Sequence, residues 1–475
     1  MLGARVETRI IGVETEYGVH TVHPTKRPLA PDEVARYMFK PVVAWGNSSN
    51  VFIPNGSRLY LDVGSHPEYA TAETTRLEEL LASDAAGDSI MHMLVTQAQQ
   101  AMAQDGFDGD IYLYRNNADS LGNSYGSHEN YMIERTTQYR RLTQALLPFL
   151  VTRQLIAGNG VVIKDPAALP LADQFPSRAE PHFAFSQRAD YMHEAISSSS
   201  TRARPMINTR DEPHSDSTKY RRLHVIVGDS NMSETTQLLR FGATDLLLRL
   251  IESGKPLPNL QLAHPVRAIR QTSHDLTGNT PLDLADGRTM TALEIQEFYL
   301  AQAQDFLARQ GPHHDYLDQI MDLWSRTLQA IARQDFSSID TEIDWAIKHK
   351  FMTAYATKNN LDWDAARLVQ LDMSYHDIHP QRGLFNLLEA RGAAARVLTD
   401  AQVQAAHDNP PATTRALLRH RFIETARAMG MEYSMDWMHM KLNYYPMHTL
   451  YVRNPFETDI SVVDELFAKV ASASD

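Results

Sequence analysis

Cysteine is absent from the 475-residue chain. The other composition values, 43% hydrophobic and 22% charged residues, are ordinary for a globular protein with a large core. Without cysteine there can be no disulfide bond, iron–sulfur cluster, zinc site with thiolate ligands or cysteine nucleophile. Any acyl transfer that this protein carries out must therefore avoid a thioester on the enzyme.

Long hydrophobic runs are also missing, and positive charge is in deficit. The most apolar segments, 146–151 and 246–251, are too short to span a membrane. Residues 1–12 lack the apolar core of a signal peptide, so we expect a cytoplasmic protein. The 45 Lys and Arg against 58 Asp and Glu give a formal net charge of −13, which disfavours general binding to nucleic acids or membranes. No oligomerisation segment is visible, and we expect a monomer.

Hydrophobic periodicity predicts strands early in the chain and helices later. Alternation predicts strands at 9–19, 57–63, 111–115, 127–133 and 222–228. Helical spacing predicts helices at 77–104, 142–157, 233–253, 291–310, 315–334, 340–351 and 415–429, and short strands follow around 435–442 and 448–452. Pro410 and Pro411 interrupt this helical sequence. We predict an α+β fold with a large domain at 1–408 and a small C-terminal domain at 409–475.

Two of the predicted strands each carry a polar face and an apolar face. Residues two apart on a strand share a face, so Glu14 and Glu16 lie together in the segment 9–19. Glu68 follows the segment 57–63 after a short turn. If both strands belong to one sheet, several carboxylates converge on its polar surface. The second strand adds Arg58, Tyr60 and Asp62 to that surface.

Crowded carboxylates of this kind repel one another unless cations offset their charge. Mg²⁺ is a hard cation that protein carboxylates and substrate phosphates hold together. Arg58 would then suit phosphate oxygens, and a remaining carboxylate could act as a general base. Alternatively, these residues form the solvated outer face that antiparallel strands commonly present. The pattern alone leaves both interpretations open.

Two further signals are weak by themselves. His224 shares a strand face with Arg222, but a lone histidine is more often a hydrogen-bonded structural residue than a ligand. The segment 201–222 contains six Lys or Arg and three Asp or Glu, which suits phosphates or an acidic peptide as well as a solvated loop. The sequence has neither a GxxxxGK[ST] phosphate loop nor an HExxH zinc motif.

Several long strings resemble the Pup ligase family, whose members attach the small prokaryotic ubiquitin-like protein Pup to lysines of target proteins. The resemblance rests on GVETEYG (12–18), SRLYLDVGSHPEYATAE (57–73), NSYGSHENY (123–131), NTRDEPH (208–214), RRLHVIVGDSNMSE (221–234), YHDI (375–378), PPATTRALLR (410–419) and DWMHMKLN (436–443). The family is related to glutamine synthetase and the carboxylate–amine ligases. The resemblance therefore implies a glutamine-synthetase-like domain, with an antiparallel β-sheet cradle packed on helices, and a small C-terminal α/β domain.

The resemblance also implies a role for individual residues. Asp62 matches the catalytic base. The residues that match ATP-contacting positions are Arg58, Thr71 and Trp437. The expected metal ligands are Glu14, Tyr60 and Glu68, with Glu16 as an additional ligand and His224 at the metal or nucleotide site.

In the family, ATP and Mg²⁺ convert the γ-carboxylate of the C-terminal glutamate of Pup to a γ-glutamyl phosphate. A target lysine then displaces phosphate and forms an isopeptide bond, which marks the target for proteasomal degradation. Pup is acidic and largely disordered, so basic surface should capture it, and the sequence offers 201–222 together with Arg415, Arg419 and Arg421.

Two alternatives to the ligase stay open at this point. One is the sister depupylase or Pup deamidase, and the other is a non-catalytic Pup-binding adaptor. Depupylases carry an extra loop between the first two motif strands. The compact stretch 35–62 has no such insertion, which favours the ligase.

Overall fold

A computed structural model describes residues 8–23, 25–46, 48–62, 64–119, 122–175, 178–199, 204–443 and 448–473. The segment assessed for a signal peptide, up to residue 7, and the first residues of the basic segment, 201–203, lie outside this description. Within the described residues no helix has the length and hydropathy required to cross a lipid bilayer.

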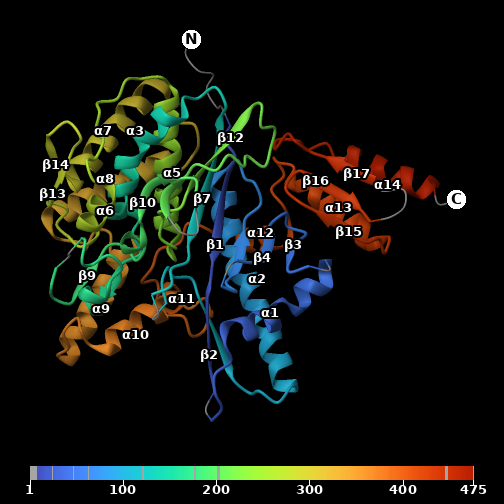
Figure 1. Cartoon of the computed structure of the whole chain (residues 1–475), viewed down its shortest axis with the longest axis horizontal. Coiled ribbons are helices and arrows are strands. Elements are labelled where there is room, and N and C mark those ends of the chain that lie inside the picture. The colour runs from blue at the N-terminus through green and yellow to red at the C-terminus, as the bar shows by residue number, and fades with distance from the viewer. Residues whose placement is uncertain are drawn as a thin grey trace.

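An eight-stranded sheet forms the centre of the molecule (Figure 1). Neighbouring strands are antiparallel except for the parallel pair at one edge, β10 and β11. The predicted α+β class with an antiparallel sheet is thereby confirmed. In order across the sheet, the strands are β10 (Glu194–Ser197), β11 (Pro205–Asn208), β12 (Tyr220–Val225), β7 (Ser127–Glu134), β1 (Ile11–Glu16), β5 (Pro67–Ala70), β4 (Arg58–Leu61) and β3 (Asn50–Phe52).

The first predicted strand divides in two. β1 ends at Glu16, and β2 (Gly18–Val22) leaves the central sheet to pair with β6 (Asp110–Tyr114). Three further small sheets lie outside the central one. They consist of β8 (Val161–Ile163) with β9 (His182–Ala184), β13 (Pro281–Asp283) with β14 (Thr289–Thr291), and β15 (Tyr433–Met435) with β16 (His439–Leu442) and β17 (His448–Tyr451).

The helices predicted from periodicity are present with small changes at their ends. α2 (Leu77–Gln104) has the predicted bounds, and a capping box formed by Thr291 and Glu294 starts α7. The predicted helix 142–157 is divided into α3 and α4, and α9 continues past its predicted end. These and the other predicted helices are α3 (Tyr139–Thr152), α4 (Gln154–Ala157), α5 (Glu234–Glu252), α7 (Ala292–Gln310), α8 (Leu317–Arg333), α9 (Asp344–Asn359) and α13 (Ala416–Ala428).

Other α-helices were not predicted, and four of them have ten residues or fewer. α1 contains Pro41, a residue that usually interrupts a helix. These helices are α1 (Pro31–Gly46), α6 (Pro265–Ser273), α10 (Ala366–Tyr375), α11 (Leu384–Ala390), α12 (Asp400–Asp408) and α14 (Ser461–Ala473).

The sheet buries one face against helices and leaves the other polar. Ile11 and Val13 of β1 belong to the largest core cluster, together with Leu223 of β12 and residues of α3, α5, α7 and α8. A second cluster joins α1 and α2 to the β3–β5 edge. A third consists only of residues between 418 and 470, and in Figure 1 this red C-terminal part projects from the body.

A buried ion-pair network fixes β7 to the helices behind the sheet. Glu129 is fully buried and accepts hydrogen bonds from Arg153, at 2.5 and 2.8 Å, and from Arg240 at 3.0 Å. Burial raises the pKa of Glu129, but the charges of Arg153 and Arg240 outweigh it and lower the pKa to about 2. Because His128 and Asn130 alternate with Glu129 along the strand, this anchor also holds the opposite face of β7 in place.

We expect Glu129→Gln to destabilise the fold by about 3–5 kcal/mol, because it leaves two buried arginines without their counter-charge. The contribution of Glu129 should be fully present above its unfolded pKa of about 4.3 and disappear as the pH falls towards 2. Urea unfolding at several pH values measures this effect. The exposed Glu297→Gln is the matched control, and an equal loss in both variants would contradict the role given to the network.

Candidate functional site

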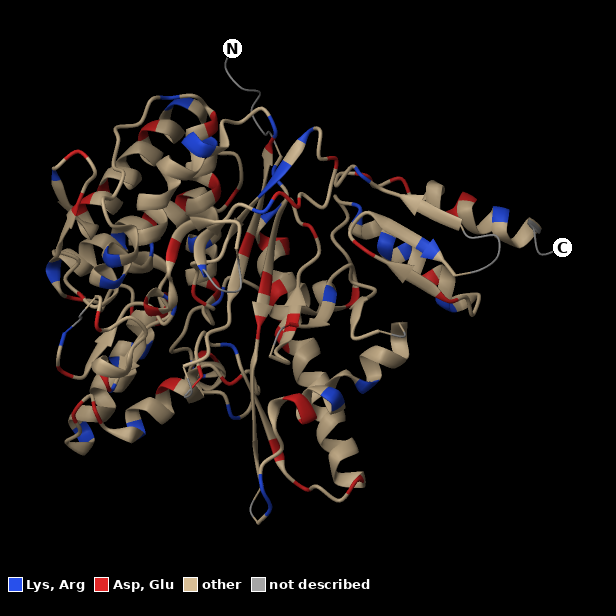
Figure 2. Ribbon diagram, in the orientation of Figure 1, with Lys and Arg blue, Asp and Glu red and all other residues tan. Residues whose placement is uncertain are grey.

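The polar face of the sheet gathers carboxylates from three adjacent strands. Glu16 of β1 lies directly opposite Glu68 of β5, and Glu68 lies opposite Tyr60 of β4. The Tyr60 hydroxyl donates a hydrogen bond to Glu68. On the other side of β1, Glu14 pairs with His128 of β7. Figure 2 shows acidic positions in red along these central strands.

These side chains line one cavity of about 540 Å³. Its potential cation ligands fall into two groups, each with ligand atoms within 4.8 Å of one another. The first group consists of Glu14, His128 and His224, and the second of Glu16, Asp62 and Glu68. All predicted metal ligands therefore lie together, and Asp62 joins them from the end of β4.

The two groups differ in their electrostatics. Burial raises the pKa of Glu14, but the hydrogen bond with His128 and the charges of His224 and Arg222 lower it well below the usual range. Burial, with the charges of Glu16 and Glu14, instead raises the pKa of Glu68 well above its usual value. The pKa of Glu16 is raised by burial as well. The second group thus lacks the positive charge it needs to be fully ionised.

The surroundings of His224 also favour a bound cation. It is buried, its Nε2 lies 3.8 Å from a Glu14 carboxylate oxygen, and neither ring nitrogen has a hydrogen-bond partner among the described residues. Burial lowers the pKa of His224 well below its usual value, which keeps the imidazole neutral. A neutral imidazole beside crowded carboxylates is a suitable ligand set for a divalent cation, so these residues fit Mg²⁺ or a related ion.

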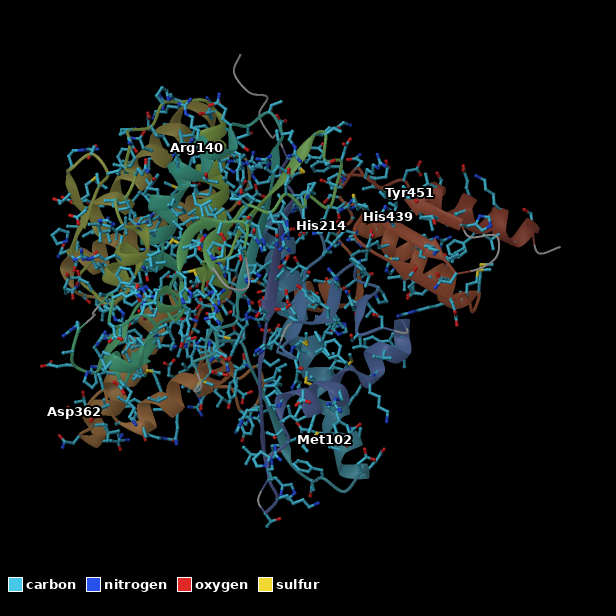
Figure 3. The ribbon with its side chains drawn as sticks, viewed as in Figure 1. Met102, Arg140, His214, Asp362, His439 and Tyr451 are labelled. Carbon is cyan, nitrogen blue, oxygen red and sulfur yellow. The ribbon has the colours of Figure 1, made fainter. Side chains whose placement is uncertain are left out.

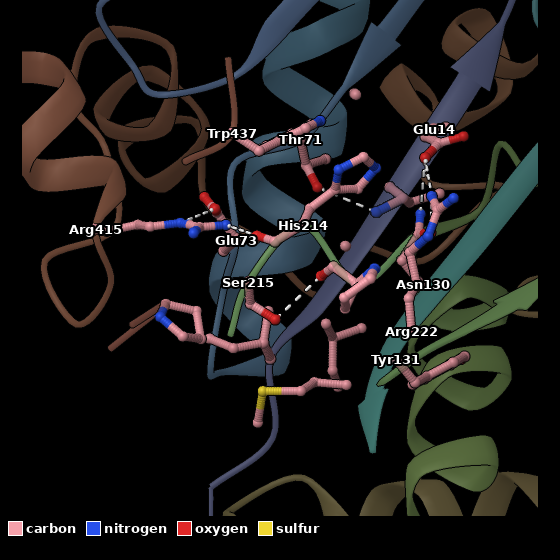
Figure 4. A pocket seen from close by; sticks show the side chains of 18 of the residues that line it. Glu14, Thr71, Glu73, Asn130, Tyr131, His214, Ser215, Arg222, Arg415 and Trp437 are labelled. Atoms are coloured by element: carbon pink, nitrogen blue, oxygen red, sulfur yellow. Dashed lines mark hydrogen bonds and ion pairs between the residues drawn. The ribbon is translucent and has the colours of Figure 1, made fainter. Parts of the chain in front are cut away.

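A second pocket adjoins the cavity and shares Glu14 and Arg222 with it (Figure 4). Thr71 and Trp437, the predicted nucleotide contacts, both line this pocket. The Thr71 hydroxyl accepts a hydrogen bond from the Val13 amide at 3.1 Å, which ties the pocket to β1. The two spaces together form one cleft, with a mostly apolar pocket at one end and the carboxylates at the other.

The C-terminal part of the chain completes this pocket. Trp437 packs edge-on against Phe52 of β3, with ring centroids 4.9 Å apart, and its ring lies 6.0 Å from His214. Figure 3 labels His214 between the sheet and the C-terminal part. Burial, together with the charge of Arg222, lowers the pKa of His214 to about 4. The pocket therefore presents neutral rings from both parts of the chain.

Glu73 clamps the C-terminal part onto the sheet. It accepts hydrogen bonds from Arg415, at 2.7 Å, and from Arg419, and both arginines are almost fully buried. The prediction that these two arginines form basic surface for Pup is therefore wrong, because both are buried inside the protein and paired with Glu73. Arg421 is exposed but pairs with Asp464 at 2.8 Å.

Two predicted residues lie at the margins of the cleft. Arg58 shares the polar face, where its guanidinium lies 4.6 Å from the Tyr60 ring centroid and its Nε donates to Asn50 at 2.6 Å. It lines neither the pocket nor the cavity as they stand. Asp62 lies at the cavity rim, and it is exposed whereas Glu16 and Glu68 are buried.

Sequence reasoning did not identify three further residues of the cleft. Alternation in 127–133 places His128 on the polar face, and this pattern could have indicated it as a site residue. Arg222 was placed beside His224 but not in the site, where it contacts Glu14 at 3.4 Å. Arg188 reaches the cavity from an irregular segment that follows β9, so no periodic pattern could have indicated it.

The chain is similar to known proteins over almost all of its length. The model of the family described as Pup-ligase protein matches residues 9–441. A Pup–protein ligase of Micrococcus luteus is 56% identical, with 98% of each chain covered, and one of Paenarthrobacter aurescens is 53% identical, with 97% and 99% covered.

Two solved structures are similar as well. The ligase PafA in complex with Pup gives a TM-score of 0.92 at 44% identity and covers 98% of this chain and 93% of that one. PafA in complex with ADP gives 0.84 at 45% identity, with 95% and 96% covered.

We expect Glu68→Gln to raise the dissociation constant for Mn²⁺ by about tenfold or more, because it removes a ligand and a charge. Electron paramagnetic resonance of free Mn²⁺ measures the change without any reaction. Glu297→Gln should bind as the unaltered chain does. Equal Mn²⁺ affinity in all three proteins would contradict a cation site at the carboxylates.

Glu73→Gln should loosen the C-terminal part, because both buried arginines lose their counter-charge. Trypsin cleaves after arginine, so we expect faster cleavage at Arg415 and Arg419 and altered fluorescence of Trp437. The exposed Glu424→Gln on the same C-terminal part serves as the control. If the two arginines stay protected in Glu73→Gln, the clamp is not what holds them.

Proposed function

Because the chain belongs to the Pup ligase family, we propose that it is an ATP- and Mg²⁺-dependent Pup–protein ligase. It joins the γ-carboxylate of the C-terminal glutamate of Pup to a lysine amine of a target protein, and so marks the target for proteasomal degradation. The similarity to named Pup–protein ligases over 98% of the chain carries this proposal. The cleft supports it, since a pocket for a nucleotide adjoins a carboxylate cavity.

The proposed nucleotide site lies in the pocket at Thr71 and Trp437, with Arg58 at its margin. Similarity to PafA, whose structure in complex with ADP is known, supports binding of a nucleotide by this chain. The proposed Mg²⁺ ligands are Glu14, Glu16, Tyr60, Glu68 and His224, to which the geometry adds His128. Bound Mg²⁺ supplies charge neutralisation for the phosphates.

The chemistry requires an activated carboxylate. A carboxylate is a poor acyl donor because its leaving group would be an oxide, and a chain without cysteine cannot form a thioester. Transfer of the γ-phosphoryl group of ATP to the Pup carboxylate makes phosphate the leaving group. Attack by the lysine amine then forms the isopeptide bond and releases phosphate, and ADP is the other product.

Asp62 is the proposed base. A lysine attacks only as a free amine, yet its ordinary pKa is about 10.4. The exposed position of Asp62 at the cavity rim suits a lysine presented on a folded protein, whereas Glu16 and Glu68 are buried. The negative charge of Asp62 attracts the incoming ammonium group and then accepts its proton.

Two observations favour the ligase over a depupylase or an adaptor. The chain runs from α1 through β3 to β4 with short connections, which leaves no room for the loop that depupylases carry. The carboxylates expected of a catalyst also lie together in the cavity, whereas an adaptor would not require them. The separate core between 418 and 470 supports the proposed division into domains at 1–408 and 409–475, with Trp437 contributed by the smaller one.

The direct test mixes the purified chain with Mg-ATP, Pup ending in glutamate and a lysine-bearing protein, and measures intact mass. The expected product is target plus Pup minus one water, with one ADP formed alongside each adduct. Cleavage of a preformed conjugate without adduct formation would favour the depupylase, and neither reaction would favour the adaptor.

Asp62→Asn should retain Mg-ADP affinity but lose about 10²–10⁴-fold in conjugation rate, as expected for loss of a general base. The loss should shrink as the pH rises, because more of the lysine is then unprotonated. Isothermal titration and initial rates measure the two effects. The control is Asp362→Asn in the loop after α9, labelled in Figure 3, and normal conjugation by Asp62→Asn would exclude Asp62 as the base.

A further inference from the structure

Arg188 is a buried cation in the cavity, and no ion pair joins it to a carboxylate among the described residues. Arg188 is only 3% exposed, although it lines the space that the carboxylates face. Its Nη1 donates a hydrogen bond to the Ser124 hydroxyl at 2.7 Å. Its Nε has no hydrogen-bond partner among the described residues. A buried guanidinium that satisfies so few of its five donors within the described part of the chain is well suited to bind an anion.

The protein holds Arg188 rigidly in this position. Its backbone amide donates to Asp229 at 3.0 Å and to the Ser186 hydroxyl at 3.1 Å. Asp229 itself accepts from the Asn159 amide at 2.9 Å, so the anchor reaches into the buried body of the protein. These contacts fix the backbone of Arg188, while its side chain lines the cavity.

The electrostatic surroundings of Arg188 also call for an anion. Burial lowers the pKa of Arg188 to about 10, with Arg204 adding to the effect and Glu16 opposing it. The side chain stays protonated at neutral pH, but its charge is poorly solvated. Arg210 lines the same cavity but is exposed, so water solvates its charge better than that of Arg188.

The position in the cleft indicates which anion. Arg188 lines the carboxylate cavity but not the pocket at Thr71 and Trp437, so it lies away from the proposed nucleotide site. The C-terminal glutamate of Pup carries two carboxylates. The γ-carboxylate must face the phosphates, whereas the α-carboxylate stays charged and unreacted throughout. A guanidinium matches a carboxylate with two parallel hydrogen bonds, which fixes orientation as well as position.

We propose that Arg188 binds the α-carboxylate of the C-terminal glutamate of Pup, so that only the γ-carboxylate is presented for phosphorylation. This inference rests on the proposed function and names the group that orients the acyl substrate. It also explains how an enzyme can select between two carboxylates on one residue. A buried, desolvated cation discriminates strongly against a neutral amide, which would leave the charge unpaired.

The test compares two forms of Pup, one with a free α-carboxylate and one whose terminal glutamate carries an α-carboxamide and keeps its γ-carboxylate. Wild-type kcat/KM should fall about 10- to 100-fold with the amide, the range expected for loss of a charged hydrogen bond in a buried site. This arm requires no variant. The absence of any preference in the wild-type chain would overturn the proposal.

Variants then link the preference to Arg188. Arg188→Gln should react slowly with both forms of Pup and lose the preference for the free α-carboxylate, because the cation that binds this carboxylate is removed. Arg188→Lys should recover part of it, since the charge stays but the paired donors do not. The exposed Arg391→Gln should behave as wild type. Unfolding midpoints and Mg-ADP affinity of each variant establish that fold and nucleotide site are intact.

Other outcomes have distinct meanings. A wild-type preference that persists undiminished in Arg188→Gln would overturn the assignment, even if both rates fell, because Arg188 would then act on another group. A wild-type chain that conjugates neither form would instead overturn the proposed function, so the two failures are distinguishable.

Discussion

Repulsion among carboxylates on one face of the sheet is the constraint on which the cleft depends. Glu16, Glu68 and Asp62 present ligand atoms within 4.8 Å of one another, and burial together with the charges of Glu16 and Glu14 raises the pKa of Glu68. Bound cations relieve this repulsion, so the protein alone is an incomplete charge arrangement. His224 and the buried Arg188 line the same cavity as this cluster.

Two anchors hold this unfavourable arrangement in place. Behind the sheet, Glu129 joins β7 to two arginines of the helical layer. On the other side, Glu73 holds the C-terminal part over the pocket through hydrogen bonds with Arg415 and Arg419. Each carboxylate carries a pKa of about 2, so both anchors are charged at any pH where the protein works. These two paired carboxylates contrast with Glu16 and Glu68, whose pKa values are raised in the cavity.

Much of the fold and site was predictable because both follow from local patterns. Alternation in β1 and β4 placed Glu14 with Glu16 and Tyr60 with Asp62, and the helical period gave α2 to the residue. Pairing across the sheet was not predictable, because the neighbours of β1 come from distant segments. Arg188 has no periodic context, and the commitment of Arg415 and Arg419 to Glu73 required knowing that residues more than 300 apart in sequence meet. The resemblance to a family supplied the roles that spacing alone left open.

The alternation of β1 has a consequence for how this protein can change. Ile11 and Val13 belong to the core, while Glu14 and Glu16 face the cavity from the same short strand. An insertion or deletion of a single residue within β1 would turn every side chain beyond it to the other face, exposing apolar groups and burying carboxylates. Sequence drift here is therefore confined to substitutions, and changes of length must occur in the loops around the sheet.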